Sequence, residues 1–172
     1  MTPAFKGEGD AVLLIGETLG WLGQSLYLRE ICGREEGAPP PVDLAAERRH
    51  GEFVRALIRD GLLSAVHDIS DGGLLVTLAE MAMASRIGAV VEAPPGVPAH
   101  AFWFGEDQGR YIVSTNSADA VMQRARAAGV PVARLGATGG EVLAVAGERP
   151  LLVKDLRARF EAWLPAYMAA PA

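Results

Sequence analysis

The chain has 172 residues, half of them apolar and 22% charged, which suits a globular domain with one substantial core. Its 16 basic and 21 acidic residues give a net charge of −5, and this argues against a nucleic-acid-binding surface, which is normally basic. A single cysteine, Cys32, excludes an internal disulfide, and no apolar run approaches the roughly 20 residues of a membrane span, so we expect a cytoplasmic protein.

The spacing of apolar residues predicts alternating strands and helices over the first 92 residues. The predicted elements are a strand over 11–16, a helix over 22–31, a proline loop over 37–41, a helix from 43 to 61, a strand over 62–66, a helix over 73–85 and a strand over 88–92. Asp43 should cap its helix, with Leu44 and Leu57 on the buried side. Cys32 should be a half-buried spectator. The strands around the 73–85 helix form a crossover unit, so we expect them to pair in parallel.

The second half of the chain continues this alternation. Its predicted elements are strands over 101–104 and 111–115, a helix from 117 or 119 to 129, strands over 130–135 and 141–146, and an amphipathic helix over 154–168. The pattern predicts an α/β (α+β) fold with a mixed β-sheet covered by helices. We expect one domain over 1–172, with a flexible lead-in over 1–8 and a C-terminal extension and helix over 147–172.

A first candidate site is the segment from His67 to Gly73, where a strand ends and a helix begins. Asp68 and Asp71 could hold a divalent cation, Asp68 more readily, because Mg²⁺ prefers oxygen ligands. Gly72 and Gly73 lack β-carbons, so a phosphate or another ligand could approach the backbone and the helix N-terminus. The alternative is structural: Asp71 caps the helix and the glycines allow a tight turn.

A second candidate site is the polar segment from Phe104 to Arg110. Glu106, Asp107 and Gln108 could accept hydrogen bonds from a substrate, and Arg110 could pair with a carboxylate or phosphate. The alternative is a solvated hairpin turn between two strands. The glycine-spaced stretch 16–25 lacks the lysine of a nucleotide-binding P-loop, so it carries little weight as a site.

Four stretches together suggest a family. They are LGQSLYL at 22–28, PPPVDL at 39–44, HDISDGGL at 67–74 and FGEDQGR at 104–110. Residues 9–146 resemble the last C-terminal domain of the synthetase subunit in the phosphoribosylformylglycinamidine synthase family. More broadly, they resemble the C-terminal domain of the aminoimidazole ribonucleotide synthetase superfamily.

The resemblance implies a role in purine biosynthesis. Enzymes of this family convert formylglycinamide ribonucleotide, ATP and glutamine-derived ammonia to the amidine, and use Mg²⁺ and ATP. Asp68 matches a metal-associated aspartate, and Glu106, Asp107 and Gln108 match a substrate-contacting segment. In this half of the enzyme the family forms a pseudo-site, so the resemblance implies that these four residues serve placement and packing. We therefore expect no catalytic residue in this chain; His67 is not the family's catalytic histidine.

The resemblance also implies partners. These are the remaining domains of the synthetase, a glutaminase subunit and a small accessory subunit. Alone, the domain is expected to be inactive, to need no cofactor and to expose apolar surface through which it can form a homodimer. Two alternatives stay open: a domain of a related enzyme such as aminoimidazole ribonucleotide synthetase, and a stand-alone ligand-binding or assembly module.

Overall fold

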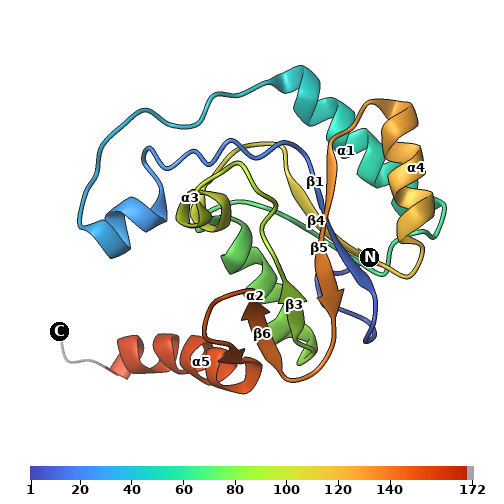
Figure 1. The fold of residues 1–172 in the computed structure, drawn as a ribbon. Coiled ribbons are helices and arrows are strands. Elements are labelled where there is room, and N and C mark those ends of the chain that lie inside the picture. Colours follow the sequence, from blue (N-terminus) through green and yellow to red (C-terminus); the bar gives the residue numbers. More distant parts are fainter. Residues whose placement is uncertain (170–172) are drawn as a thin grey trace.

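The computed structural model describes residues 1–169, and within them seven strands form one mixed sheet. Its strands are β1 (Ala11–Ile15), β2 (Ala65–Asp68), β3 (Ala89–Val91), β4 (Tyr111–Thr115), β5 (Val132–Thr138), β6 (Val142–Val145) and β7 (Leu151–Leu152). They lie in the order β2-β4-β1-β5-β3-β6-β7 (Figure 1). All of the paired neighbours are antiparallel except β3 and β6, so the predicted mixed α/β fold is confirmed.

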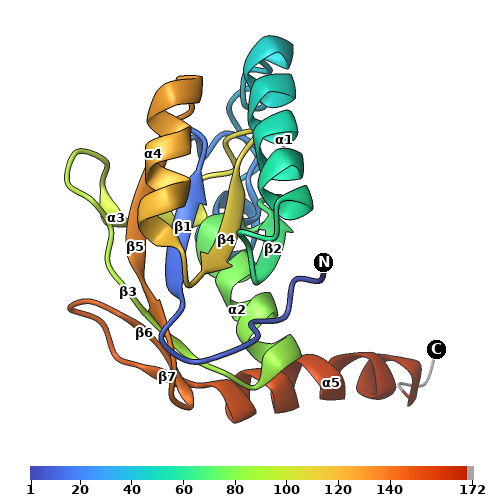
Figure 2. The same ribbon diagram turned by 90° about the vertical axis from the view of Figure 1, so that its right-hand side faces the viewer.

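Helices cover both faces of this sheet (Figures 1 and 2). They are α1 (Leu44–Arg59), α2 (Gly73–Ser85), α3 (Ala99–Phe104), α4 (Ala118–Ala128) and α5 (Val153–Ala169). Helices α1 and α4 pack on the face to which β1 contributes Leu13 and Ile15. Helices α2 and α3 pack on the other face, with Val12 and Leu14. This double coverage explains why every residue of β1 is buried and apolar, although its neighbours are antiparallel.

Most of the predicted elements are confirmed, and α2 has the predicted bounds. Asp43 caps α1 as predicted: its carboxylate accepts hydrogen bonds from the amides of Ala45 and Ala46, both at 3.0 Å. The bond from Ala46 is the main reason why the pKa of the Asp43 carboxyl lies below its ordinary value. Leu44 was wrongly predicted to be buried, since it is 73% exposed at the very start of the helix.

The expected parallel pairing of the strands around α2 is wrong. Strands β2 and β3 run in the same direction, but β4, β1 and β5 lie between them. The connection through α2 therefore crosses three strands, and β3 finds its parallel partner in β6 instead. The crossover rule concerns the handedness of such a connection and does not require the two strands to be neighbours.

A predicted strand over 101–104 is also wrong, because these residues form α3. The amides of Phe102 and Gly105 donate to Pro98 O and Ala101 O, each four residues earlier and both at 2.9 Å, which is the bonding pattern of an α-helix. Pro98 precedes the helix with a φ of −53°, close to the helical value that proline favours at a helix start. The segment 104–110 therefore connects a helix to a strand rather than two strands of a hairpin.

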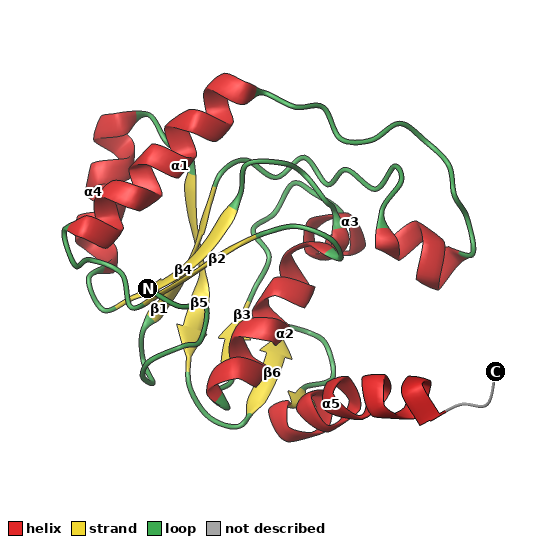
Figure 3. Ribbon diagram, turned by 180° about the vertical axis from the view of Figure 1, so that it is seen from behind, coloured by secondary structure: helices red, strands yellow, loops and turns green. Residues whose placement is uncertain are grey.

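The predicted helix over 22–31 is shorter than expected. A single π-helical segment, η1 (Tyr27–Ile31), follows an irregular stretch, and Cys32 at its end is exposed rather than half-buried. From there a long arch runs over residues 33–43 to the start of α1 (Figure 3). The lead-in over 1–8 packs on the molecule: Phe5 is buried in the core, and the amide of Val66 donates to Thr2 O at 3.3 Å.

Candidate functional site

The polar segment 104–110 meets two other parts of the chain, the stretch 16–26 and the start of α2. Glu106 joins them through one oxygen, Oε1, which accepts from the amides of Leu26 and Gly72, both at 2.8 Å. Gly72 is the residue before α2, so Glu106 satisfies a backbone donor at the helix start, whereas the structural alternative had Asp71 as the cap. The Glu106 carboxylate thus accepts hydrogen bonds from the protein's own backbone.

Asp107 fastens the same stretch at a second point. Its carboxylate accepts from the amides of Gly20 at 3.0 Å and Trp21 at 3.2 Å, and its side chain is buried. The backbone adds a bond, from the Glu106 amide to Trp21 O at 2.9 Å. The two bonds to the Asp107 carboxylate belong to the class with a charged acceptor, which is about twice as strong as hydrogen bonds between neutral groups. They give the irregular stretch 16–26 a defined path.

Arg110 lies inside the molecule and is 1% exposed. Its guanidinium donates to Asp107 O at 3.0 Å, to Thr18 Oγ1 at 3.0 Å and to Gly105 O at 2.7 Å. Burial lowers the pKa of Arg110, and the nearby Asp107 carboxylate opposes this. This placement gives no support to the predicted pairing of Arg110 with a ligand. The guanidinium instead donates to two carbonyl groups of its own segment and to Thr18.

Gly72 and Gly73 allow backbone to approach backbone. Both have a positive φ, +81° and +73°, which favours glycine. A β-carbon on Gly73 would lie 2.7 Å from Gly105 O, so the start of α2 packs directly on the 104–110 segment. The close approach that the sequence suggested for a ligand is made here by the protein itself.

The exposed carboxylates of the candidate site lie on the other side of this contact. Asp68, Asp71, Glu47 and Gln108 line a depression of about 300 Å³ together with Tyr111. The Asp68 side chain is 72% exposed, and its Oδ1 lies 3.3 Å from His67 Nδ1. Burial, followed by the charges of Asp68 and Glu47, raises the pKa of Tyr111.

The side chains of this depression would supply only some of the ligands that a divalent cation needs. In residues 1–169 no group of three or more His, Cys, Asp or Glu side chains has metal-binding geometry. Mg²⁺ usually takes one or two carboxylates, phosphate oxygens and several waters, so exposed Asp68 and Asp71 suit it as partial ligands. The site is therefore an open acidic surface beside a rigid polar core.

One buried side chain escaped the sequence analysis. His50 on α1 is 5% exposed, and its Nδ1 lies 2.9 Å from the carbonyl oxygen of Gly109, which makes Nδ1 the donor. Its Nε2 is buried and has no hydrogen-bond partner within the described residues. The spacing of 50, 53, 54 and 57 along α1 puts His50 on the apolar face, and that spacing was the available signal.

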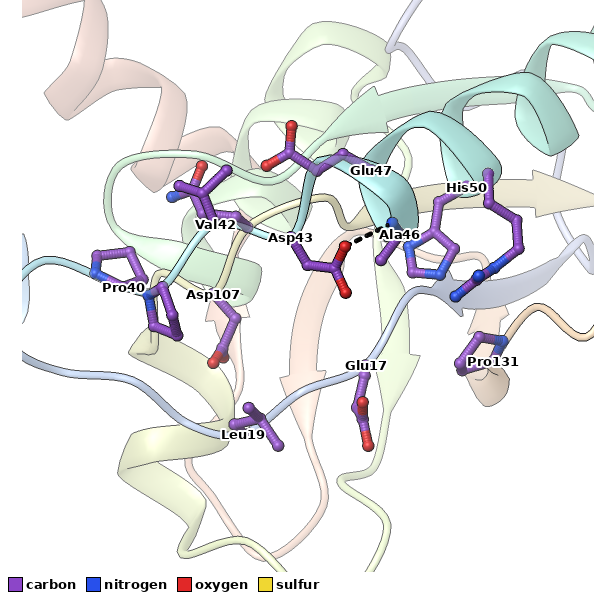
Figure 4. Close-up of a pocket in the computed structure, with 13 residues that line it drawn as sticks. Glu17, Leu19, Pro40, Val42, Asp43, Ala46, Glu47, His50, Asp107 and Pro131 are labelled. Carbon is purple, nitrogen blue, oxygen red and sulfur yellow. Dashed lines mark hydrogen bonds between the residues drawn. The ribbon is translucent and has the colours of Figure 1, made fainter.

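His50 borders a second cleft, of about 300 Å³, under the arch. Figure 4 shows Glu17 and Asp107 on one side of it and Asp43 and His50 on the other. The arch is fixed over the cleft by hydrogen bonds from Trp21 Nε1 to Ala38 O, at 2.9 Å, and from Gln24 Nε2 to Gly37 O, at 3.0 Å. The residues 104–110 thus lie between two open acidic depressions.

Comparison with known families matches residues 7–146 to the family described as AIR synthase related protein, C-terminal domain. The chain belongs to this family. The match spans nearly the range 9–146 in which the sequence showed its resemblance, and it includes both acidic segments. Within residues 1–169, no helix of this family member is both long and apolar enough to cross a membrane.

Its similar relatives are much longer proteins. The phosphoribosylformylglycinamidine synthase subunit PurL of Methylocella silvestris is 68% identical over 169 residues, which are 97% of this chain and 23% of that protein. The PurL subunit of Azorhizobium caulinodans is 59% identical over 173 aligned positions, or 99% of this chain and 24% of that protein. The family member described here therefore spans about a quarter of their length.

Solved structures share the fold. Thermotoga maritima PurL complexed with FGAR aligns with a TM-score of 0.74 and 17% identity, over 91% of this chain and 29% of that one. The same protein complexed with ATP, and in a structure of PurLQS, aligns with TM-scores of 0.69 and 0.70 over 91% of this chain and 27% of that one. At 17–18% identity these likenesses concern the fold.

Proposed function

We propose that this chain is the last C-terminal domain of a longer phosphoribosylformylglycinamidine synthase subunit. The observation that carries the proposal is the 68% identity to a PurL subunit over 97% of the chain. The longer protein would use ATP and ammonia to convert formylglycinamide ribonucleotide to its amidine in purine biosynthesis. The same identity disfavours both alternatives, a domain of aminoimidazole ribonucleotide synthetase and a stand-alone module.

Within that enzyme, the segment 104–110 would position backbone rather than contact substrate. Glu106, Asp107 and Arg110 direct their polar groups at backbone and at Thr18, which supports a positioning role. Gln108 is exposed between the two depressions and is the member of the segment most open to a ligand. This distribution agrees with a pseudo-site, whose residues keep the ancestral packing.

The cofactors would act at the boundary with other domains. Asp68, with Asp71 as a weaker second ligand, would hold Mg²⁺ that offsets phosphate charge when ATP is bound. The remaining ligands would come from phosphate, water or a neighbouring domain. A glutaminase subunit and a small subunit would complete the assembly, as the PurLQS structure of the T. maritima relative suggests, and the cytoplasm would be its location.

A replacement experiment tests the proposal. The matched quarter of the M. silvestris PurL is exchanged for this chain, and amidine formation from formylglycinamide ribonucleotide, Mg-ATP and ammonia is measured. We expect the chimera to keep activity within about 10-fold of the parent, a loss of roughly 1.4 kcal/mol in transition-state stabilisation.

The 172-residue chain alone serves as the control. We expect no amidine from it, because the residues that the structure describes contain no glycine-rich loop with a lysine that could hold the nucleotide phosphates. Turnover by the chain alone would overturn its assignment as part of an incomplete enzyme. A folded chimera without activity would overturn the assignment to this synthase.

A further inference from the structure

Helix α5 begins in the core and then leaves it. Val153 is buried and Leu156 packs on the core, but the rest of the helix extends away from the sheet (Figures 1 and 2). The large apolar side chains along this extension are 57–74% exposed; they are Phe160, Trp163, Leu164, Tyr167 and Met168. We call these five residues the α5 stripe.

The α5 stripe has the spacing of a helix that docks in a groove. Each member has another member three or four residues away, so the five share one side of the helix and continue the line of Val153 and Leu156. Trp163 and Tyr167 stack at a ring-centroid distance of 5.2 Å. A contiguous solvent-exposed face of five large apolar side chains marks a contact with another protein surface.

The end of α5 is also weakly stabilised by its own backbone hydrogen bonds. Pro165 lies inside the helix and cannot donate to the carbonyl of Glu161, four residues earlier. A proline within a helix costs about 3 kcal/mol, and in water most helical stability comes from packing of an apolar face. The last turns of α5 therefore need a surface against the α5 stripe.

The comparisons indicate what that surface belongs to. The family match ends at residue 146, so it does not include α5. The A. caulinodans PurL nevertheless matches 99% of this chain, which includes nearly all of α5, and it is about four times as long. The helix thus accompanies chains in which further domains are present.

We infer that the α5 stripe docks into an apolar groove on a neighbouring domain of the same longer polypeptide. This inference rests on the proposed function, since it requires the rest of the synthetase. A second copy of this chain is the competing occupant. It would give an isolated chain that dimerises through α5.

Hydrogen exchange read by mass spectrometry separates these occupants. Peptides covering residues 157–169 are compared between the isolated 172-residue chain and the chimera with M. silvestris PurL. We expect exchange of these amides to slow at least about 10-fold in the chimera, while the amides of α4 stay unchanged. Equal exchange in both proteins would overturn the inference, and so would concentration-dependent protection of α5 in the isolated chain.

Two matched variants place the contact on one side of the helix. Trp163→Glu puts a charge in the α5 stripe and should abolish the protection in the chimera. Ala162→Glu introduces the same charge on the opposite side, where the exposed position tolerates it, and should leave the protection intact. Equal effects of the two variants would contradict docking through the stripe.

Failure of this inference can be told apart from failure of the proposed function. An active chimera with unprotected α5 would refute the docking and leave the function standing. A folded, inactive chimera with protected α5 would refute the function and leave the docking onto a neighbouring domain standing.

Discussion

The segments 67–73 and 104–110 have similar compositions and opposite uses for their carboxylates. Each places acidic side chains beside glycines, and each looked like a ligand site in the sequence. In 104–110 the carboxylates of Glu106 and Asp107 accept bonds from four backbone amides. In 67–73 the carboxylate of Asp68 stays 72% exposed. The number of unsatisfied backbone donors nearby, and not the acidic composition, separates the two segments.

Three of the four donors, the amides of Gly20, Trp21 and Leu26, come from an irregular stretch that lies outside the sheet. Residues 16–26 follow β1 without forming a helix or strand, so their amides need side-chain partners. Segment 104–110 supplies those partners, which lie 80 or more residues later in the chain. Polar residues next to an irregular, partly buried stretch should therefore first be considered as its hydrogen-bond partners.

Replacement of Arg110 should produce the largest effect on stability. Arg110→Met removes three hydrogen bonds and leaves the buried Asp107 carboxylate without its cation, which should lower the free energy of unfolding by about 3–5 kcal/mol. Urea unfolding followed by circular dichroism measures the loss. Arg124→Met is the matched control, since its ion pair with Asp60 is half exposed and should be worth less than about 1 kcal/mol. Similar losses in both variants would mean that the buried Arg110 does not hold segment 104–110 in place.

Glu106 should give an intermediate effect that depends on the replacement. Glu106→Ala leaves the amides of Leu26 and Gly72 unpaired and should cost about 2–3 kcal/mol. Glu106→Gln keeps an oxygen in place and should cost about 1 kcal/mol, because only the charge is lost. Urea unfolding of the two variants checks the order. If both cost nothing, Glu106 is free for a ligand and the positioning role is wrong.

Asp68 should give the smallest effect on stability and a clear one on cation use. Asp68→Asn changes an exposed side chain, so the free energy of unfolding should move by less than about 0.5 kcal/mol. In the active chimera, the Mg²⁺ concentration for half-maximal rate should rise about 10-fold if Asp68 is a ligand. An unchanged Mg²⁺ dependence would leave 67–73 without a ligand role, and the two segments would then both be structural.

The fold could be predicted where local signals were complete. Asp43 before a periodic apolar run and Gly61 after it located α1, and the apolar period of 73–85 located α2 with its observed bounds. The strand order could not be predicted in this way, because it depends on which distant strands become neighbours. Nothing local places β4, β1 and β5 between β2 and β3.

The candidate site was predicted in composition but not in geometry. The residues 104–110 and the start of α2 do meet, through the bond from Gly72 to Glu106 and the packing of Gly73 on Gly105, as a shared site would require. Their inward direction was not visible, because it depends on amides of Gly20 and Leu26 some 80 residues earlier. His50 was missed for a different reason: on an apolar helix face, a histidine is usually a satisfied core residue.

The position of β1 in the sheet has a consequence for how the chain folds during synthesis. Within this domain β1 is the first strand to be synthesised, yet its partners are β4 and β5, which start about 100 and 120 residues later. The centre of the sheet therefore assembles only when most of the domain has been translated, and pairing over such separations is slow. Until then the apolar segment AVLLI has no strand partner, and unpaired apolar strands of this kind favour aggregation of a partly folded chain.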